Sequence, residues 1–187
     1  MTVTSEVWKL KSGIRAVMLA LVLLALGGVA HAEGTLRIVP LVRAEQVFVS
    51  IDLDNGYTDE VREVINGGVR TTFTYDVDLK MIVPAWVDRT IATAVVTTTD
   101  HYDTLTRVHN LSRSVDGRVV EALVTESEAI AKKWLTSLNG LVLCRTSLLD
   151  PHREYYVRIS ARVRPPGATL LGWATGVTNL AKFTFLP

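Results

Sequence analysis

The sequence predicts a mainly β fold, either an antiparallel β-sandwich or a strongly twisted antiparallel sheet, with two short helices. Several segments alternate apolar and polar residues with a period of two, which is typical of strands that have one buried face. Most of these segments are joined by short turns, and only two segments show helical periodicity. A parallel sheet would need a crossover connection at nearly every strand, and the chain lacks such connections. We therefore expect antiparallel neighbours.

The longest alternating segment, residues 69–83, is expected to form one long strand. Its odd positions are mostly apolar and its even positions mostly polar, so one face would be buried and the other exposed. A short helix is expected just before it, over residues 58–66. Thr58 is a good N-cap, Asp59 suits the positive end of the helix dipole, and Gly67 follows as a stop.

Further strands are expected where apolar residues recur in extended, β-branched segments. They lie at residues 36–42, 47–53, 86–99, 105–113, 118–124, 141–148, 154–164 and 181–185. Pro40 cannot donate a backbone hydrogen bond, which makes the first of these an edge strand or a strand end. The second arm of a long hairpin would be 86–99, residues 100–103 would form a turn, and Asp116 followed by glycine would close a tight hairpin.

A second helix is expected after the strand at 118–124. Thr125 and Glu128 have the spacing of a capping box, in which each side chain binds the other residue's backbone N–H. Apolar residues then recur on one helical face as far as Leu138. Asn139 and Gly140 are expected to end this helix.

The strands should share one core, because each presents a single apolar face that must be covered. The predicted members of this core are Ile51, Leu53, Phe73, Tyr75, Val77, Leu79, Val157 and Ile159. Tyr75 and Thr74 would then lie on opposite faces of the same strand.

Residues 1–32 are expected to be a signal peptide, which leaves residues 33–187 as a single antiparallel β-rich domain. Three basic residues up to Arg15 form a positive region, residues 16–26 are apolar, and small residues precede a cleavage site after Ala32. An uncleaved anchor is the alternative, but the apolar run is shorter than the roughly 20 residues that span a bilayer. The mature protein is therefore expected in the periplasm or cell envelope, without a stable membrane span.

The charge of the chain argues against nucleic acid as a partner. The whole sequence has a formal charge of +1, and loss of the signal segment would leave about −1, so no basic excess remains. The single cysteine, Cys144, cannot form an internal disulfide, although an exported compartment would permit one. Packing alone is expected to hold the fold.

Six short blocks stand out along the chain. They are NGYTDEVRE at 55–63, NGGV at 66–69, TFTYDVDL at 72–79, YDTLTR at 102–107, SR at 112–113 and YYVR at 155–158. In this order the blocks resemble a bacterial family known as domain of unknown function forty-three ninety (DUF4390). The resemblance covers most of the chain after the signal segment and implies a small exported protein. The family has no assigned activity, so the resemblance implies no catalytic residue and no cofactor.

Four side chains could gather around a metal ion if a hairpin brought them together: Asp100, His101, Asp103 and His109. Carboxylate and imidazole groups are suitable ligands for zinc and related metals. Their spacing across a turn is not a ligand signature, however, and histidines are common in exposed turns. No nucleophile motif, phosphate loop or dinucleotide fingerprint occurs, so no catalytic residue and no cofactor is predicted.

Arg158, Arg162 and Arg164 all lie at even positions of the segment 154–164, so on a strand they would project to the same side, where successive positions are about 7 Å apart. Such a basic stripe could bind an anionic partner. The alternative is that acids on the polar face of the long strand, Asp76 and Asp78, neutralise it.

These observations favour a non-enzymatic binding or interaction module that uses a sheet face or edge. Its partner would be another envelope protein or an anionic surface polymer. One alternative is a periplasmic hydrolase, metal-dependent or not, with a site assembled from distant residues. A further alternative is an accessory input domain for a membrane sensor.

Overall fold

The computed structural model describes residues 35–164 and 177–186, with the side chain of Arg164 not described. Within these residues the elements follow one another as strands with two helices and one 3-10 turn. They are β1 (Thr35–Arg43), β2 (Gln46–Asp54), α2 (Asp59–Asn66), β3 (Thr71–Met81), β4 (Arg89–Asp103), β5 (Val108–Val115), β6 (Arg118–Thr125), α3 (Glu128–Thr136), β7 (Ser137–Arg145), η1 (Thr146–Leu148), β8 (Glu154–Arg164) and β9 (Val177–Thr184).

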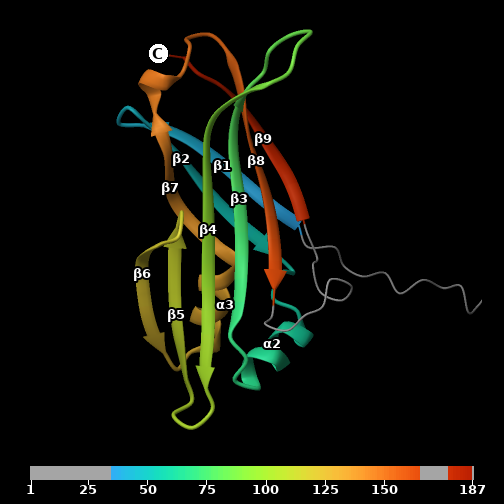
Figure 1. The fold of residues 1–187 in the computed structure, drawn as a ribbon, viewed down its shortest axis with the longest axis vertical. Coiled ribbons are helices and arrows are strands. Elements are labelled where there is room, and N and C mark those ends of the chain that lie inside the picture. The colour runs from blue at the N-terminus through green and yellow to red at the C-terminus, as the bar shows by residue number, and fades with distance from the viewer. Residues whose placement is uncertain (1–34, 165–176, 187) are drawn as a thin grey trace, which may run out of the picture. The chain divides into compact units, whose positions relative to one another are not determined.

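The strands form two antiparallel sheets (Figure 1). The larger sheet has six strands in the order β6-β5-β4-β3-β8-β9, and the smaller has three in the order β1-β2-β7. Every strand pair is antiparallel, as the turn lengths predicted. The mainly β, sandwich-like fold expected from the sequence is confirmed.

The core lies between the inner faces of the two sheets. All eight predicted core residues are buried, none more than 6 % exposed, and all belong to one apolar cluster. β3 shows why the prediction succeeds: its side chains alternate strictly between buried and partly exposed along all 11 residues. In a strand with one buried face, the alternation of apolar and polar residues specifies the register, because a shift of one residue would move every apolar side chain to the exposed face.

The two sheets meet along one side and diverge on the other. β1 and β9 lie next to each other, and the side-chain amide of Asn179 on β9 donates to the carbonyl of Leu36 on β1 at 2.6 Å. On the opposite side, β6 ends the large sheet and pairs only with β5 among the described strands. β1 is an edge strand, as Pro40 predicted.

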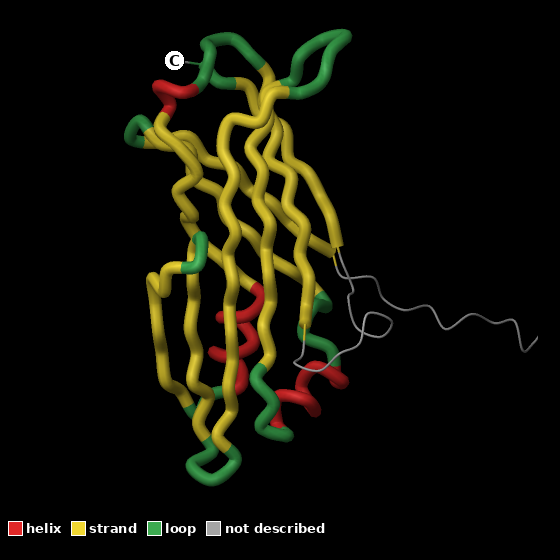
Figure 2. Tube along the Cα trace, viewed as in Figure 1, coloured by secondary structure: helices red, strands yellow, loops and turns green. Residues whose placement is uncertain are grey.

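Both helices lie toward the end of the large sheet where β4 turns into β5 (Figure 2). α2 begins as predicted, because the hydroxyl of Thr58 accepts a hydrogen bond from the amide of Val61. α3 packs on the inner face of the large sheet. The carbonyl of Leu135 near its C-terminus accepts hydrogen bonds from the hydroxyls of Tyr75 (2.6 Å) and Thr98 (3.2 Å). None of the described helices is long and apolar enough to cross a bilayer.

Several predicted boundaries are wrong. Residues 100–103 belong to β4 rather than to a turn, and the turn follows at 104–107, with Leu105 93 % exposed. β4 begins at Arg89, so Trp86 lies in the preceding loop. α3 ends at Thr136 and passes directly into β7, which therefore includes the residues expected to stop the helix. The predicted capping box is also absent: the N-cap is Ser127, and Thr125 accepts a hydrogen bond from its amide.

Candidate functional site

The four residues considered as metal ligands do not converge. Asp100 and His109 point inward and pair, whereas His101 lies on the exposed face of β4. Asp103 accepts hydrogen bonds from the amides of Leu105 and Thr106 in the β4–β5 turn, and these bonds hold the pKa of its carboxyl below the ordinary value. Within the described residues no group of three or more histidine, cysteine, aspartate or glutamate side chains is placed to hold a metal ion.

Asp100 on β4 and His109 on β5 form a buried polar pair. The Nδ1 atom of His109 lies 2.8 Å from Oδ2 of Asp100, and the two side chains are 3 % and 0 % exposed. Burial raises the pKa of the Asp100 carboxyl, since the charged form loses its water, and the hydrogen bond with His109 opposes this rise. The other carboxylate oxygen, Oδ1, has no hydrogen-bond partner among the described residues.

Two tyrosines complete the surroundings of this pair. The ring of Tyr102 lies 4.7 Å from that of His109, centroid to centroid. The pKa of Tyr57 is raised to about 12, first by burial and then by the negative charges of Glu128 and Asp100. A carboxylate–imidazole pair can orient a general base, but a base must reach the substrate. With His109 buried, the pair is better suited to fixing β4 against β5 than to catalysis.

The predicted basic stripe is paired with acids across β3. Arg158 lies 2.7 Å from Asp78, and Arg162 forms an ion pair with Asp76. The strand register explains this, because Arg158 lies directly opposite Asp78, and Arg162 lies opposite Thr74, two residues from Asp76 on the same face. The structure thus shows internal pairing for two of the arginines, while the side chain of Arg164 lies outside the described residues.

Changing Arg158 and Arg162 together to glutamine is expected to lower the free energy of unfolding by about 1 kcal/mol or less, because both ion pairs are largely exposed. If the stripe also binds an anionic partner, the double variant should lose a salt-sensitive interaction with envelope material. Urea unfolding and a pull-down at low and high salt measure the two effects. Binding that persists at low salt would exclude the stripe as a partner site.

The most unusual surface of the described chain is the edge strand β6. Every residue from Arg118 to Val124 is exposed, although the strand is rich in aliphatic side chains. Val119 and Val124 are 68 % and 63 % exposed, and Val120 and Leu123 also face solvent. Edge strands usually carry charges or proline that discourage pairing with other chains, but β6 has only two charged residues, Arg118 and Glu121.

A bulge divides the side chains of β6 between two faces. The pairing shifts between Arg113 and Ser114 of β5, so that Glu121 pairs with the former and Val119 with the latter. Val119, Ala122 and Val124 consequently share the outer face of the sheet, while Glu121 and Leu123 face α3. Aliphatic side chains are thus available on both faces of the edge.

Arg113 holds β6 and α3 in place. Its guanidinium forms an ion pair with Glu121 at 2.7 Å and lies over the ring of Trp134. It also donates hydrogen bonds to the carbonyls of Trp134 and Ser137 at the C-terminal end of α3. The helix dipole is negative at this end, so a cation is favourable there. Trp134 packs in a small second core with Leu111 and Ala131. Through Arg113, β6 is therefore fixed relative to α3.

The sequence contained a signal for this surface. The segment 118–125 reads RVVEALVT, in which adjacent aliphatic residues break the alternation expected of a strand with one buried face. Its place as a strand was predicted, but its exposure on both faces was not. That exposure depends on the strand order, which places β6 at the end of the sheet.

These features define a two-sheet antiparallel β protein with an exposed aliphatic strand, β6, at one sheet edge. The model of the family Domain of unknown function (DUF4390) matches residues 36–165. The chain belongs to this family, which confirms the resemblance seen in its sequence blocks. Neither a curated protein nor a solved structure matches the chain.

Proposed function

We propose that this protein is a non-enzymatic binding module that takes an extended segment of a partner protein onto the edge of β6. The observation that carries the proposal is the full exposure of an aliphatic strand at a sheet edge. Such an edge offers unpaired backbone N–H and C=O groups to another strand, and alternate side chains of the added strand can contact both faces.

β6 is better suited to this role than the edges on the other side of the sandwich. β1 contains Pro40, which lacks a backbone donor, and β1 and β9 lie against each other. β6 carries no proline, and its bulge leaves the run from Glu121 to Thr125 paired regularly with β5. A partner could therefore pair with this run without rearrangement of the sheet.

The chemistry of the edge favours a peptide rather than a polysaccharide as partner. Backbone pairing requires a polypeptide, and the aliphatic side chains favour β-branched or other apolar residues at alternate positions of the added strand. The signal-like segment at residues 1–32 supports export, so the partner belongs to the periplasm or cell envelope in this proposal.

A pair of matched variants tests the role of β6. Changing Val119 and Val124 to lysine places two charges on the outer face of β6, and both sites are exposed enough to accept them without loss of stability. The control changes Val39 and Leu41 of β1, 51 % and 53 % exposed, in the same way.

Both variants should keep the thermal midpoint of the wild type to within a few degrees. Crosslinking and pull-down from native envelope material should then recover a partner with the wild type and the β1 variant but not with the β6 variant. A partner recovered equally by both variants would rule out β6 as the binding edge.

A further inference from the structure

The loop between β3 and β4 is built to present two large apolar side chains. Val83 to Trp86 form a tight turn in which the amide of Trp86 donates to the carbonyl of Val83 at 3.2 Å. Pro84 presets the second position of this turn, and Ala85 has a φ of +61°, the left-handed conformation that the third position requires.

Asp88 closes the base of this loop. Its Oδ1 atom accepts a hydrogen bond from the amide of Val83 at 3.2 Å, and its Oδ2 atom accepts one from the hydroxyl of Tyr156 on β8 at 2.9 Å. The loop is therefore tied both to itself and to the neighbouring strand. At its tip, Trp86 and Val87 remain 81 % and 79 % exposed.

Other segments bring apolar residues to the same end of the sandwich. The η1 turn and the C-terminal segment at 185–186 lie there too (Figure 1). They carry Leu148 and Leu186, which are 55 % and 70 % exposed. The backbone at Phe185 is fixed to the β7–β8 connection by hydrogen bonds with His152 and Arg153. Separate parts of the chain thus supply the exposed apolar residues of this end.

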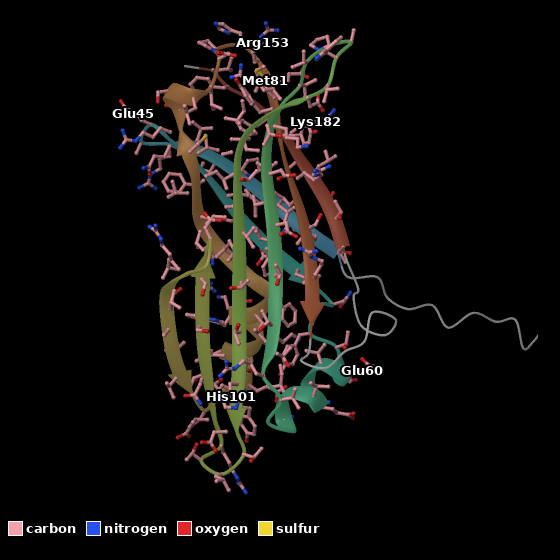
Figure 3. The ribbon with its side chains drawn as sticks, in the orientation of Figure 1. Glu45, Glu60, Met81, His101, Arg153 and Lys182 are labelled. Atoms are coloured by element: carbon pink, nitrogen blue, oxygen red, sulfur yellow. The ribbon has the colours of Figure 1, made fainter. Side chains whose placement is uncertain are left out.

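Several cations lie at the same end of the sandwich as this loop. Arg153 and Lys182 lie at this end of the sheet, near Met81, whereas His101 lies toward the other end (Figure 3). Arg89 is paired with Met81 at the start of β4 and is exposed. Exposed acids at the same end include Glu45, Asp150 and Glu154, while Asp88 is engaged in closing the loop.

We propose that this end of the protein docks on an anionic bilayer surface, with Trp86 and Val87 entering the interface. Tryptophan favours the boundary between headgroups and acyl chains, because its ring is apolar and its N–H can still reach water or a headgroup. Basic side chains beside an apolar tip add attraction to anionic lipids. A loop with cations at the same end of the sandwich fits a charged surface. The β6 edge pairs with β5, which in turn pairs with the half of β4 far from this loop, Val96–Asp103, so β6 stays free to bind.

The test uses the protein as purified from the cells that produce it. Vesicles of phosphatidylcholine alone are compared with vesicles of equal parts phosphatidylcholine and phosphatidylglycerol in a sedimentation assay. The variant changes Trp86 and Val87 to alanine. The control changes Leu105 to alanine, because this leucine is 93 % exposed at the opposite end of β4.

The wild type and the Leu105 variant should bind anionic vesicles better than neutral ones, with weaker binding at high salt. The Trp86 and Val87 variant should bind the anionic vesicles about tenfold more weakly, because two apolar side chains no longer enter the interface. Tryptophan fluorescence should shift to shorter wavelength on binding in the wild type and less in this variant. Equal binding by all three proteins would overturn the proposal. The proposal would also be overturned if the wild type bound no vesicles and the Trp86 and Val87 variant failed to bind a protein partner. Trp86 and Val87 would then contact a protein rather than a bilayer.

Discussion

Tyr75→Asp is expected to abolish folding. Tyr75 is 1 % exposed at the centre of β3, and its hydroxyl donates to the carbonyl of Leu135 at the end of α3. The substitution removes a large buried side chain, which by itself costs about 3–5 kcal/mol. It also buries a carboxyl group and leaves the Leu135 carbonyl with only the longer bond from Thr98. The sum is comparable with the whole stability of a small domain, roughly 5–15 kcal/mol.

Thr74→Asp is the matched control, and it should be tolerated. Thr74 is the preceding residue on the outer face of β3, opposite Arg162 of β8, so a carboxylate there has a cation beside it. Tyr75→Phe separates the hydroxyl from the ring and should cost about 1 kcal/mol. Circular dichroism with thermal melts measures all three variants. Equal midpoints for Tyr75→Asp and Thr74→Asp would contradict the assignment of faces on β3.

The loss of stability on replacement of Asp100 should depend on whether the new side chain can accept a hydrogen bond. An ionised carboxylate can only accept, so Nδ1–H of His109 is the donor to a charged Asp100. Asp100→Ala leaves that buried N–H without a partner and is expected to cost about 1–3 kcal/mol. Asp100→Asn keeps an acceptor of the same shape and removes the buried charge, so it should cost less or stabilise the protein.

The stability of the wild type relative to Asp100→Asn should also depend on pH. Burial raises the pKa of Asp100, so the folded state holds this proton more tightly than the unfolded chain does. The contribution of Asp100 to the free energy of unfolding is therefore full below the ordinary aspartate pKa of about 4, and it falls as pH rises through the raised value. The advantage of Asp100→Asn over the wild type should grow as the pH rises from about 4 toward neutrality. Urea unfolding across this range measures it, and a constant difference would show that Asp100 does not titrate with a raised pKa.

The strands that the sequence predicted well are those with one fully buried face. β3 and β8 alternate over their whole length, and their predicted inner residues are all in the core. In such strands a shift of one residue would expose every apolar side chain, so the local pattern carries the tertiary information.

The features that the sequence did not show depend on contacts between distant residues. Asp100 and His109 have the composition of a polar turn, and only their mutual hydrogen bond permits burial in neighbouring strands. α3 passes into β7 without a loop because Tyr75, Thr98 and Arg113 satisfy its last carbonyls. No local stop signal encodes that ending. Likewise, Trp86 is apolar and next to a strand, but the turn at Pro84 directs the chain outward.

The central claim, that a partner adds a strand to β6, is tested most directly by amide hydrogen exchange of this strand with and without the bound partner. In the free protein, amides on the side of β6 that faces away from β5 should exchange quickly, because they have no partner strand among the described residues. On binding, the amides of Arg118–Thr125 that face away from β5 should become protected, while those of the edge strand β1, Thr35–Arg43, should not change. Protection of β1 with unchanged exchange across β6 would contradict the account.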